Sequence, residues 1–101
     1  MLDEKYIKII NKIINKYGKK AQVLQTVEEM SELTKELIKN INRGKDNESE
    51  ITLEIADVLI MIMQLVEIYN IDGDKILGAM EYKLLRQDER MQNANQKFDK
   101  D

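Results

Sequence analysis

Apolar residues recur every three or four positions along most of the chain, which is the spacing of helices that bury one face. Three glycines interrupt this pattern and divide the chain into four segments, at Gly18, Gly44 and Gly73. We therefore predict four helices, over about residues 3–17, 20–42, 48–70 and 72–91. Asn47 and Asp72 precede the third and fourth segments, where their side chains are expected to act as N-caps.

This arrangement predicts an all-α fold, a four-helix bundle with short connectors. The chain has 101 residues, which fits one helical domain over residues 1–101 with a frayed polar end at residues 92–101. Helices of twenty-odd residues exceed the usual mean of about 11–12, and this length suits a bundle that packs against a second copy.

Burial is expected along one stripe of each of the first two helices. The run from Ile55 to Val66 is apolar on nearly every side and is expected to be buried all round. The stripe of the first helix comprises Tyr6, Ile7, Ile9, Ile10, Ile13, Ile14 and Tyr17, and that of the second comprises Val23, Val27, Met30, Leu33, Leu37, Ile38 and Ile41.

Composition removes several kinds of chemistry. The chain has no Cys and no His, which excludes disulfides, thiolate or imidazole metal sites, and Ser-His-Asp or Cys-His triads. The absence of Cys and of a signal peptide predicts a cytoplasmic protein, and the twelve-residue apolar run is too short for a membrane span. A net charge of −3 does not favour nucleic-acid binding.

Acidic residues form two short motifs in the negatively charged middle of the chain. Glu29 and Glu32 are three residues apart on the second predicted helix, and Glu54 and Asp57 repeat that spacing on the third. Residues three apart share a helix face, so an antiparallel pair of helices can bring both motifs to one level.

Three explanations of these acids remain open. Buried carboxylates require a neutralising partner, so Asp57 either pairs with a Lys or Arg from another helix or contributes to a cation site. Four carboxylates are hard oxygen ligands, typical of Mg²⁺, with Mn²⁺ as the alternative. An acidic solvated face is a third interpretation for the second helix alone.

The two motifs together resemble those of the MazG-like family of all-α nucleoside triphosphate pyrophosphohydrolases. The family pattern matches Glu29-x-x-Glu32 and Glu54-x-x-Asp57, with 21 residues between the motifs. The resemblance extends over about residues 17–90 and includes a basic stripe in the last helix, where the family has Lys, Asn and Arg. Here the corresponding residues are Lys83, Gln87 and Arg90, so Gln replaces the family's Asn.

The resemblance implies hydrolysis of a nucleoside triphosphate between the α- and β-phosphates, which yields a monophosphate and pyrophosphate. It implies a homodimer or homotetramer with Mg²⁺ as the cofactor, and Glu29 or Glu32 as the general base. The implied metal ligands and catalytic residues are Glu29, Glu32, Glu54 and Asp57, and the implied substrate-binding residues are Gln22, Lys83, Gln87 and Arg90.

Two alternatives accompany this interpretation. Phosphoribosyl-ATP pyrophosphohydrolase has the same fold, although Lys83 and Arg90 look more MazG-like. A non-catalytic helical module that oligomerises or binds a protein partner would instead use the acids as a solvated or docking face.

Overall fold

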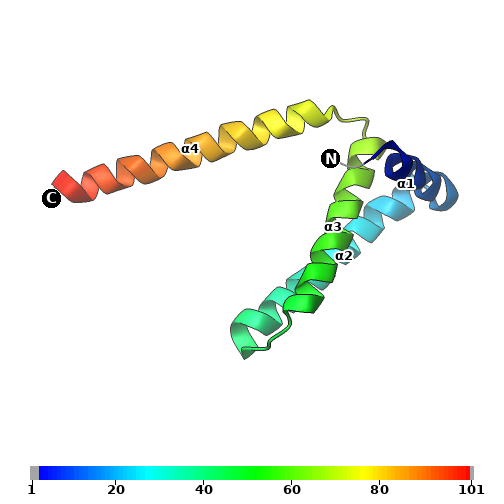
Figure 1. The fold of residues 1–101 in the computed structure, drawn as a ribbon, viewed down its shortest axis with the longest axis horizontal. Helices are drawn as coiled ribbons and strands as arrows, with labels where there is room; N and C mark the ends of the chain where they lie inside the picture. The colour runs from blue at the N-terminus through cyan, green and yellow to red at the C-terminus, as the bar shows by residue number, and fades with distance from the viewer. Residues whose placement is uncertain (1–2, 101) are drawn as a thin grey trace. The chain divides into compact units, whose positions relative to one another are not determined.

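The computed structural model describes the backbone of residues 3–100 and the side chains of residues 3–95. This part of the chain is all-helical, as the periodicity predicted, and contains no strand. The elements in chain order are α1 (Glu4–Tyr17), α2 (Lys19–Arg43), α3 (Glu48–Ile68) and α4 (Gly73–Lys100) (Figure 1).

Helix boundaries follow local sequence signals closely. Gly18 and Gly44 have positive φ angles of 94° and 63° and end α1 and α2, respectively. A glycine adopts these angles without the steric penalty of a Cβ atom. Asp72 caps α4 as predicted, because its Oδ1 accepts a hydrogen bond of 3.0 Å from the backbone N–H of Asp74. The C-terminal end of α4 differs from the prediction, since the helix continues to Lys100 rather than ending near residue 91.

The first compact unit of the chain ends at Asn70 and contains α1, α2 and α3. The helices α2 and α3 form an antiparallel hairpin around residues 44–47, and α1 packs against both of them (Figure 1). The buried apolar side chains come from α1 and α3, and three polar side chains of α2 and α3 are buried beside them. These residues are Ile10, Ile14, Met61, Gln22, Thr26 and Gln64.

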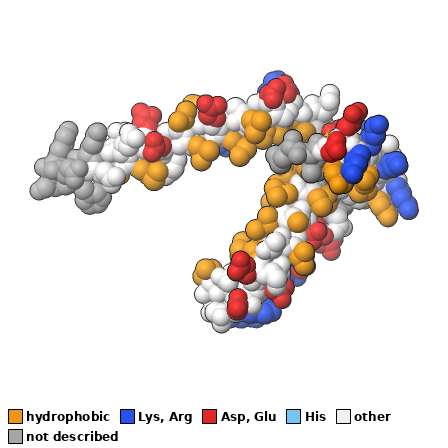
Figure 2. Space-filling view, viewed as in Figure 1, with side chains coloured by type: hydrophobic (Ala, Val, Ile, Leu, Met, Phe, Trp, Pro, Cys, Tyr) orange, Lys and Arg blue, Asp and Glu red, His pale blue; other side chains and the backbone are white. Residues whose placement is uncertain are grey.

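The burial predicted for α2 and α3 is largely wrong for this unit. In α2, five residues expected in the core are exposed: Val27, Met30, Leu37, Ile38 and Ile41. In α3, which was expected to be buried all round, Ile55, Leu59, Ile60 and Ile62 are exposed. Figure 2 shows hydrophobic side chains at the surface of the hairpin. In α1, Ile10 and Ile14 are buried as predicted, whereas Tyr6, Ile9 and Tyr17 are exposed. Three helices leave the outer faces of the hairpin uncovered, because each helix can bury only the side that meets a neighbour.

The second unit begins at Ile71 and consists of α4. Its described side chains are exposed except for Ile76, which is half-buried. Hydrophobic side chains lie at the surface along α4 (Figure 2). Among the exposed apolar residues of α4, Leu77, Leu84 and Met91 are spaced seven residues apart. Among the described helices, none is both long enough and apolar enough to cross a bilayer.

Candidate metal centre

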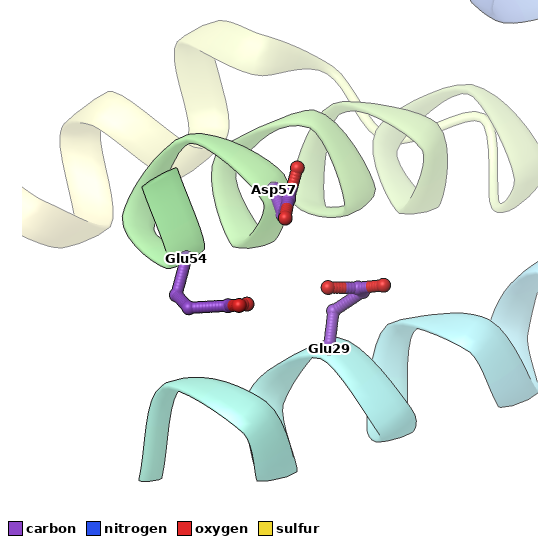
Figure 3. Close-up of side chains that lie close together, drawn as sticks. All are labelled: Glu29, Glu54 and Asp57. Carbon is purple, nitrogen blue, oxygen red and sulfur yellow. The ribbon is translucent and has the colours of Figure 1, made fainter. Parts of the chain in front are cut away.

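Three of the four predicted acids meet between α2 and α3. Carboxylate oxygens of Glu29, Glu54 and Asp57 lie within 4.8 Å of one another. In Figure 3, Glu29 extends from α2 toward α3, and Glu54 extends from α3 toward the carboxylate of Glu29. Asp57 lies one turn further along α3 from Glu54 (Figure 3). We refer to these three residues as the carboxylate triad.

The triad follows from helix geometry and the antiparallel hairpin. Glu54 and Asp57 are three residues apart on α3 and therefore share a face. Glu29 projects from the facing helix, where Gln25 donates a hydrogen bond of 2.9 Å from its Nε2 to Glu29 Oε1. This bond spans one helical turn and orients the Glu29 carboxylate, and the i,i+4 spacing of Gln25 and Glu29 is its signal in the sequence.

Glu54 has a carboxylate oxygen, Oε2, that is buried and has no hydrogen-bond partner among the described residues. Desolvation raises the pKa of Glu54 above its usual value, and the negative charges of Asp57 and Glu29 raise this pKa further. Glu32 and Glu36 add smaller contributions of the same sign. The ionised form of Glu54 therefore lacks the partner that a buried charge requires.

No basic side chain among residues 3–95 forms an ion pair with the triad. Among the side chains of residues 3–95, the ion pairs join Lys35 to Glu32 and Lys39 to Glu36, each at 3.2 Å. The alternative in which Asp57 pairs with a Lys or Arg of another helix is therefore not found within this range. Asp57 is also exposed, contrary to the burial expected from its apolar surroundings in the sequence. The carboxylate that is desolvated without a partner is therefore that of Glu54 rather than that of Asp57.

The donor set fits a hard divalent cation. Ligands of one Mg²⁺ lie about 2.0–2.1 Å from the ion, so two of them can be at most about 4.2 Å apart. The 4.8 Å limit within the triad is slightly wider than this, and small side-chain rotations would close the difference. A cation between the helices would supply the partner that Glu54 Oε2 lacks and would offset the repulsion among the three carboxylates.

The other predicted site residues lie outside the triad. Glu32 pairs with Lys35 on the surface of α2, and Gln22 is buried at the start of that helix. The structure places Lys83, Gln87 and Arg90 on the exposed surface of α4, in the second unit. Their spacing puts these three side chains on one face of α4, as the sequence predicted.

One further polar cluster was not predicted from the sequence. The side chain of Asn47 does not cap α3 and instead forms hydrogen bonds with Glu36 and Asn40 of α2. The sequence offers no periodic signal for this cluster, because its members are up to eleven positions apart along the chain.

Comparison with known proteins identifies no relative: no protein-family model, no curated protein and no solved structure matches this chain. The resemblance to the MazG-like family therefore rests on sequence motifs alone, the two acidic motifs and the basic stripe of the last helix.

Proposed function

We propose that this chain is a Mg²⁺-dependent nucleoside triphosphate pyrophosphohydrolase of the MazG-like type. The proposed reaction hydrolyses the α–β phosphoanhydride and releases a nucleoside monophosphate and pyrophosphate. The observation that carries the proposal is the buried, unpartnered Glu54 Oε2, which faces two further carboxylates without a basic residue among them.

In this proposal the triad binds the cation. Glu32, assigned as a further ligand through the resemblance, would have to leave its ion pair with Lys35. A bound cation would supply Lewis-acid chemistry, lowering the pKa of water and offsetting negative charge on the phosphates. Glu29 or Glu32 accepts the proton of the attacking water. Gln25 orients Glu29 for this role through its hydrogen bond to Oε1.

Basic residues of α4 are proposed to bind the triphosphate. Lys83, Arg86 and Arg90 recur at helical spacing on an exposed face and supply nitrogen donors for phosphate oxygens. Gln87 on the same face replaces the amide of the family pattern, and Gln22 is assigned to the substrate through the same resemblance.

We further propose that the chain forms a four-helix bundle of the all-α pyrophosphatase type and assembles as a homodimer or homotetramer. Support comes from the exposed apolar residues of α4 and of the hairpin, because large apolar surfaces of this kind are commonly covered by a partner. A second copy of the chain would bury these residues.

The test is pyrophosphate release from a panel of ribo- and deoxyribonucleoside triphosphates with Mg²⁺. The wild-type chain is expected to release pyrophosphate, and Glu54→Gln is expected to lose this activity. Glu50→Gln is the matched control, because Glu50 is an exposed acid on α3 that bonds to Ser49 rather than to the triad. No pyrophosphate from any substrate, phosphoribosyl-ATP included, would favour the non-catalytic module instead.

A further inference from the structure

Asn47 joins the two helices of the hairpin through its side chain. It is fully buried, with an exposed fraction of 0%. Its Nδ2 donates to the backbone carbonyl of Glu36 at 2.9 Å and to Glu36 Oε2 at 2.6 Å. Its Oδ1 accepts a hydrogen bond of 3.2 Å from Nδ2 of Asn40. We call Asn47, Glu36 and Asn40 the hairpin clasp.

The clasp and the carboxylate triad lie at related positions along the hairpin. Glu36 lies seven residues after Glu29 on α2, and Asn47, the last residue of the connector, lies seven residues before Glu54 of α3. Seven residues correspond to about two turns and about 10.5 Å of helix. The contact between Glu36 and Asn47 therefore lies about two turns from the pair Glu29 and Glu54, at the connector end of the hairpin.

A short connector limits how far α3 can slide against α2, and the clasp selects the alignment within that limit. The chain between α2 and α3 is four residues long and includes Gly44, whose left-handed conformation imposes no side-chain constraint. Apolar packing between helices is non-directional, and the Ile, Leu and Met side chains of α2 and α3 can pack in more than one register. Hydrogen bonds from a buried amide to a carboxylate are directional and form in only one alignment.

Repulsion among the carboxylates of the triad destabilises the helix alignment that brings them together. Glu29, Glu54 and Asp57 repel one another while they are ionised and no cation is bound, so sliding or rotation of α3 against α2 would relieve this repulsion. The clasp opposes that movement two turns away. The hydrogen bond from Asn47 lowers the pKa of Glu36, and the hydrogen bond from Lys39 lowers it further, so the acceptor stays ionised at neutral pH.

We propose that Asn47 and Glu36 are positioning residues that hold α2 and α3 in the one register in which Glu29 faces Glu54 and Asp57. They touch neither the cation nor the substrate and act through the backbone of the hairpin. The proposal rests on the proposed function for its consequence in cation binding, although the register itself can be measured without any cation.

The first experiment measures the register in cation-free protein. Because the chain has no Cys, Ser31→Cys and Thr52→Cys provide two unique sites for spin labels. Both residues are exposed, and their hydroxyls bond only within their own helices. Pulsed electron resonance is expected to give one narrow distance in the wild-type background. Asn47→Ala is expected to broaden or shift this distribution, whereas Glu36→Gln, which keeps an acceptor for Asn47, is expected to leave it unchanged.

A destabilised control separates positioning from general loss of stability. Ile14→Val weakens the core beneath α1 without contacting the clasp and is expected to keep the narrow distance. Should Asn47→Ala fail to fold by circular dichroism, Asn47→Asp provides the same comparison, because it removes both hydrogen bonds that Nδ2 donates to Glu36. An unchanged distance distribution in the clasp variant would overturn the proposal.

The second experiment measures binding of Mn²⁺ alone by electron resonance of the free ion. Asn47→Ala is expected to weaken Mn²⁺ binding about tenfold, as loss of groups that orient metal ligands commonly does, while Ile14→Val and Glu36→Gln remain within about twofold of wild type. Equal Mn²⁺ affinity in wild type and Asn47→Ala would overturn the role of the clasp in cation binding. Absence of Mn²⁺ binding to the wild type would overturn the proposed metal centre, and the spin-label distances would still decide whether the clasp sets the register.

Discussion

Glu54 and Asp57 lie one turn apart on α3 but differ in their surroundings. Glu54 has a buried oxygen without a partner, whereas Asp57 is exposed to solvent. Removal of the Asp57 side chain therefore relieves repulsion without leaving a cavity in the core. Removal of the Glu54 charge also removes the desolvation cost of a buried carboxylate oxygen. The two substitutions are expected to abolish the same function with different effects on stability.

Asp57→Ala is expected to reduce pyrophosphate release on the order of a hundredfold or more, because a ligand of the proposed cation is lost. Its free energy of unfolding without cation should equal that of wild type within about 0.5 kcal/mol or exceed it. Urea titration in EDTA measures the free energy of unfolding. Thermal scans with MgCl₂ and nucleotide measure the stabilisation that comes from cation binding. The wild type should gain melting temperature and the variant should not. A loss of several kcal/mol in EDTA would indicate a structural role for Asp57.

Glu54 makes stability depend on pH in a direction opposite to that of most acids. Its raised pKa means that the folded chain retains a proton in a pH range where the unfolded chain has lost it. Stability of the cation-free protein should therefore fall as pH rises from the ordinary Glu pKa through the raised value. Glu54→Gln should melt above wild type at pH 7, and this difference should vanish below about pH 4.

Glu36 serves as the control, because its pKa is shifted in the opposite direction to that of Glu54. Its pKa is lowered by the hydrogen bonds from Asn47 and Lys39, so its contribution to stability is present at neutral pH and is lost as pH falls through the lowered value. Glu36→Gln should therefore melt below wild type at pH 7. Thermal scans of both variants between pH 3 and 8 check the signs, and parallel curves would contradict the assigned surroundings of Glu54.

At the level of the helices, glycines serve different purposes in turns and in helix interiors. Gly44 ends α2 in the left-handed region, with φ 63° and ψ 24°, whereas Gly78 lies inside α4. No atom lies within 4 Å of a Cβ added at either position in the described chain. Backbone conformation rather than crowding therefore decides the effect of substitution.

Gly44→Ala is expected to lower the free energy of unfolding by about 1–2 kcal/mol, because an L residue is strained in the left-handed region. Gly78→Ala is expected to raise it by about 0.5–1 kcal/mol through helix propensity. Urea unfolding followed by circular dichroism measures both changes. Destabilisation by Gly78→Ala would show that another chain approaches α4 closely at this position.

At the level of the whole molecule, the chain covers few of its apolar residues. Among the described side chains, the buried apolar ones are Ile10, Ile14 and Met61. Most other apolar residues of α2, α3 and α4 are partly or largely exposed. A chain of about 100 residues has a small core even when compact, so burial against further copies adds substantially to stability. Leu77, Leu84 and Met91 of α4 repeat at the seven-residue interval typical of helices that pack along one another.

Light scattering after gel filtration is expected to show a dimer or tetramer at micromolar concentration. Leu84→Glu should shift the protein toward monomer, because it places a charge in the apolar stripe of α4. Gln92→Glu adds the same charge at an exposed polar position of α4 and should leave the assembly unchanged. A monomeric wild type would contradict the proposed assembly.

Helix positions and the shared faces of the acidic residues could be predicted from the chain alone, because they depend on neighbours within a few residues. Glycine breaks, the Asp72 cap and the pairing of Glu54 with Asp57 on one face are of this kind. Burial and cross-helix hydrogen bonds depend on residues distant in the chain. The exposure of α3, the surface pairing of Glu32 and the bond from Asn47 to Glu36 were therefore visible only in the folded hairpin, where packing decides which groups meet.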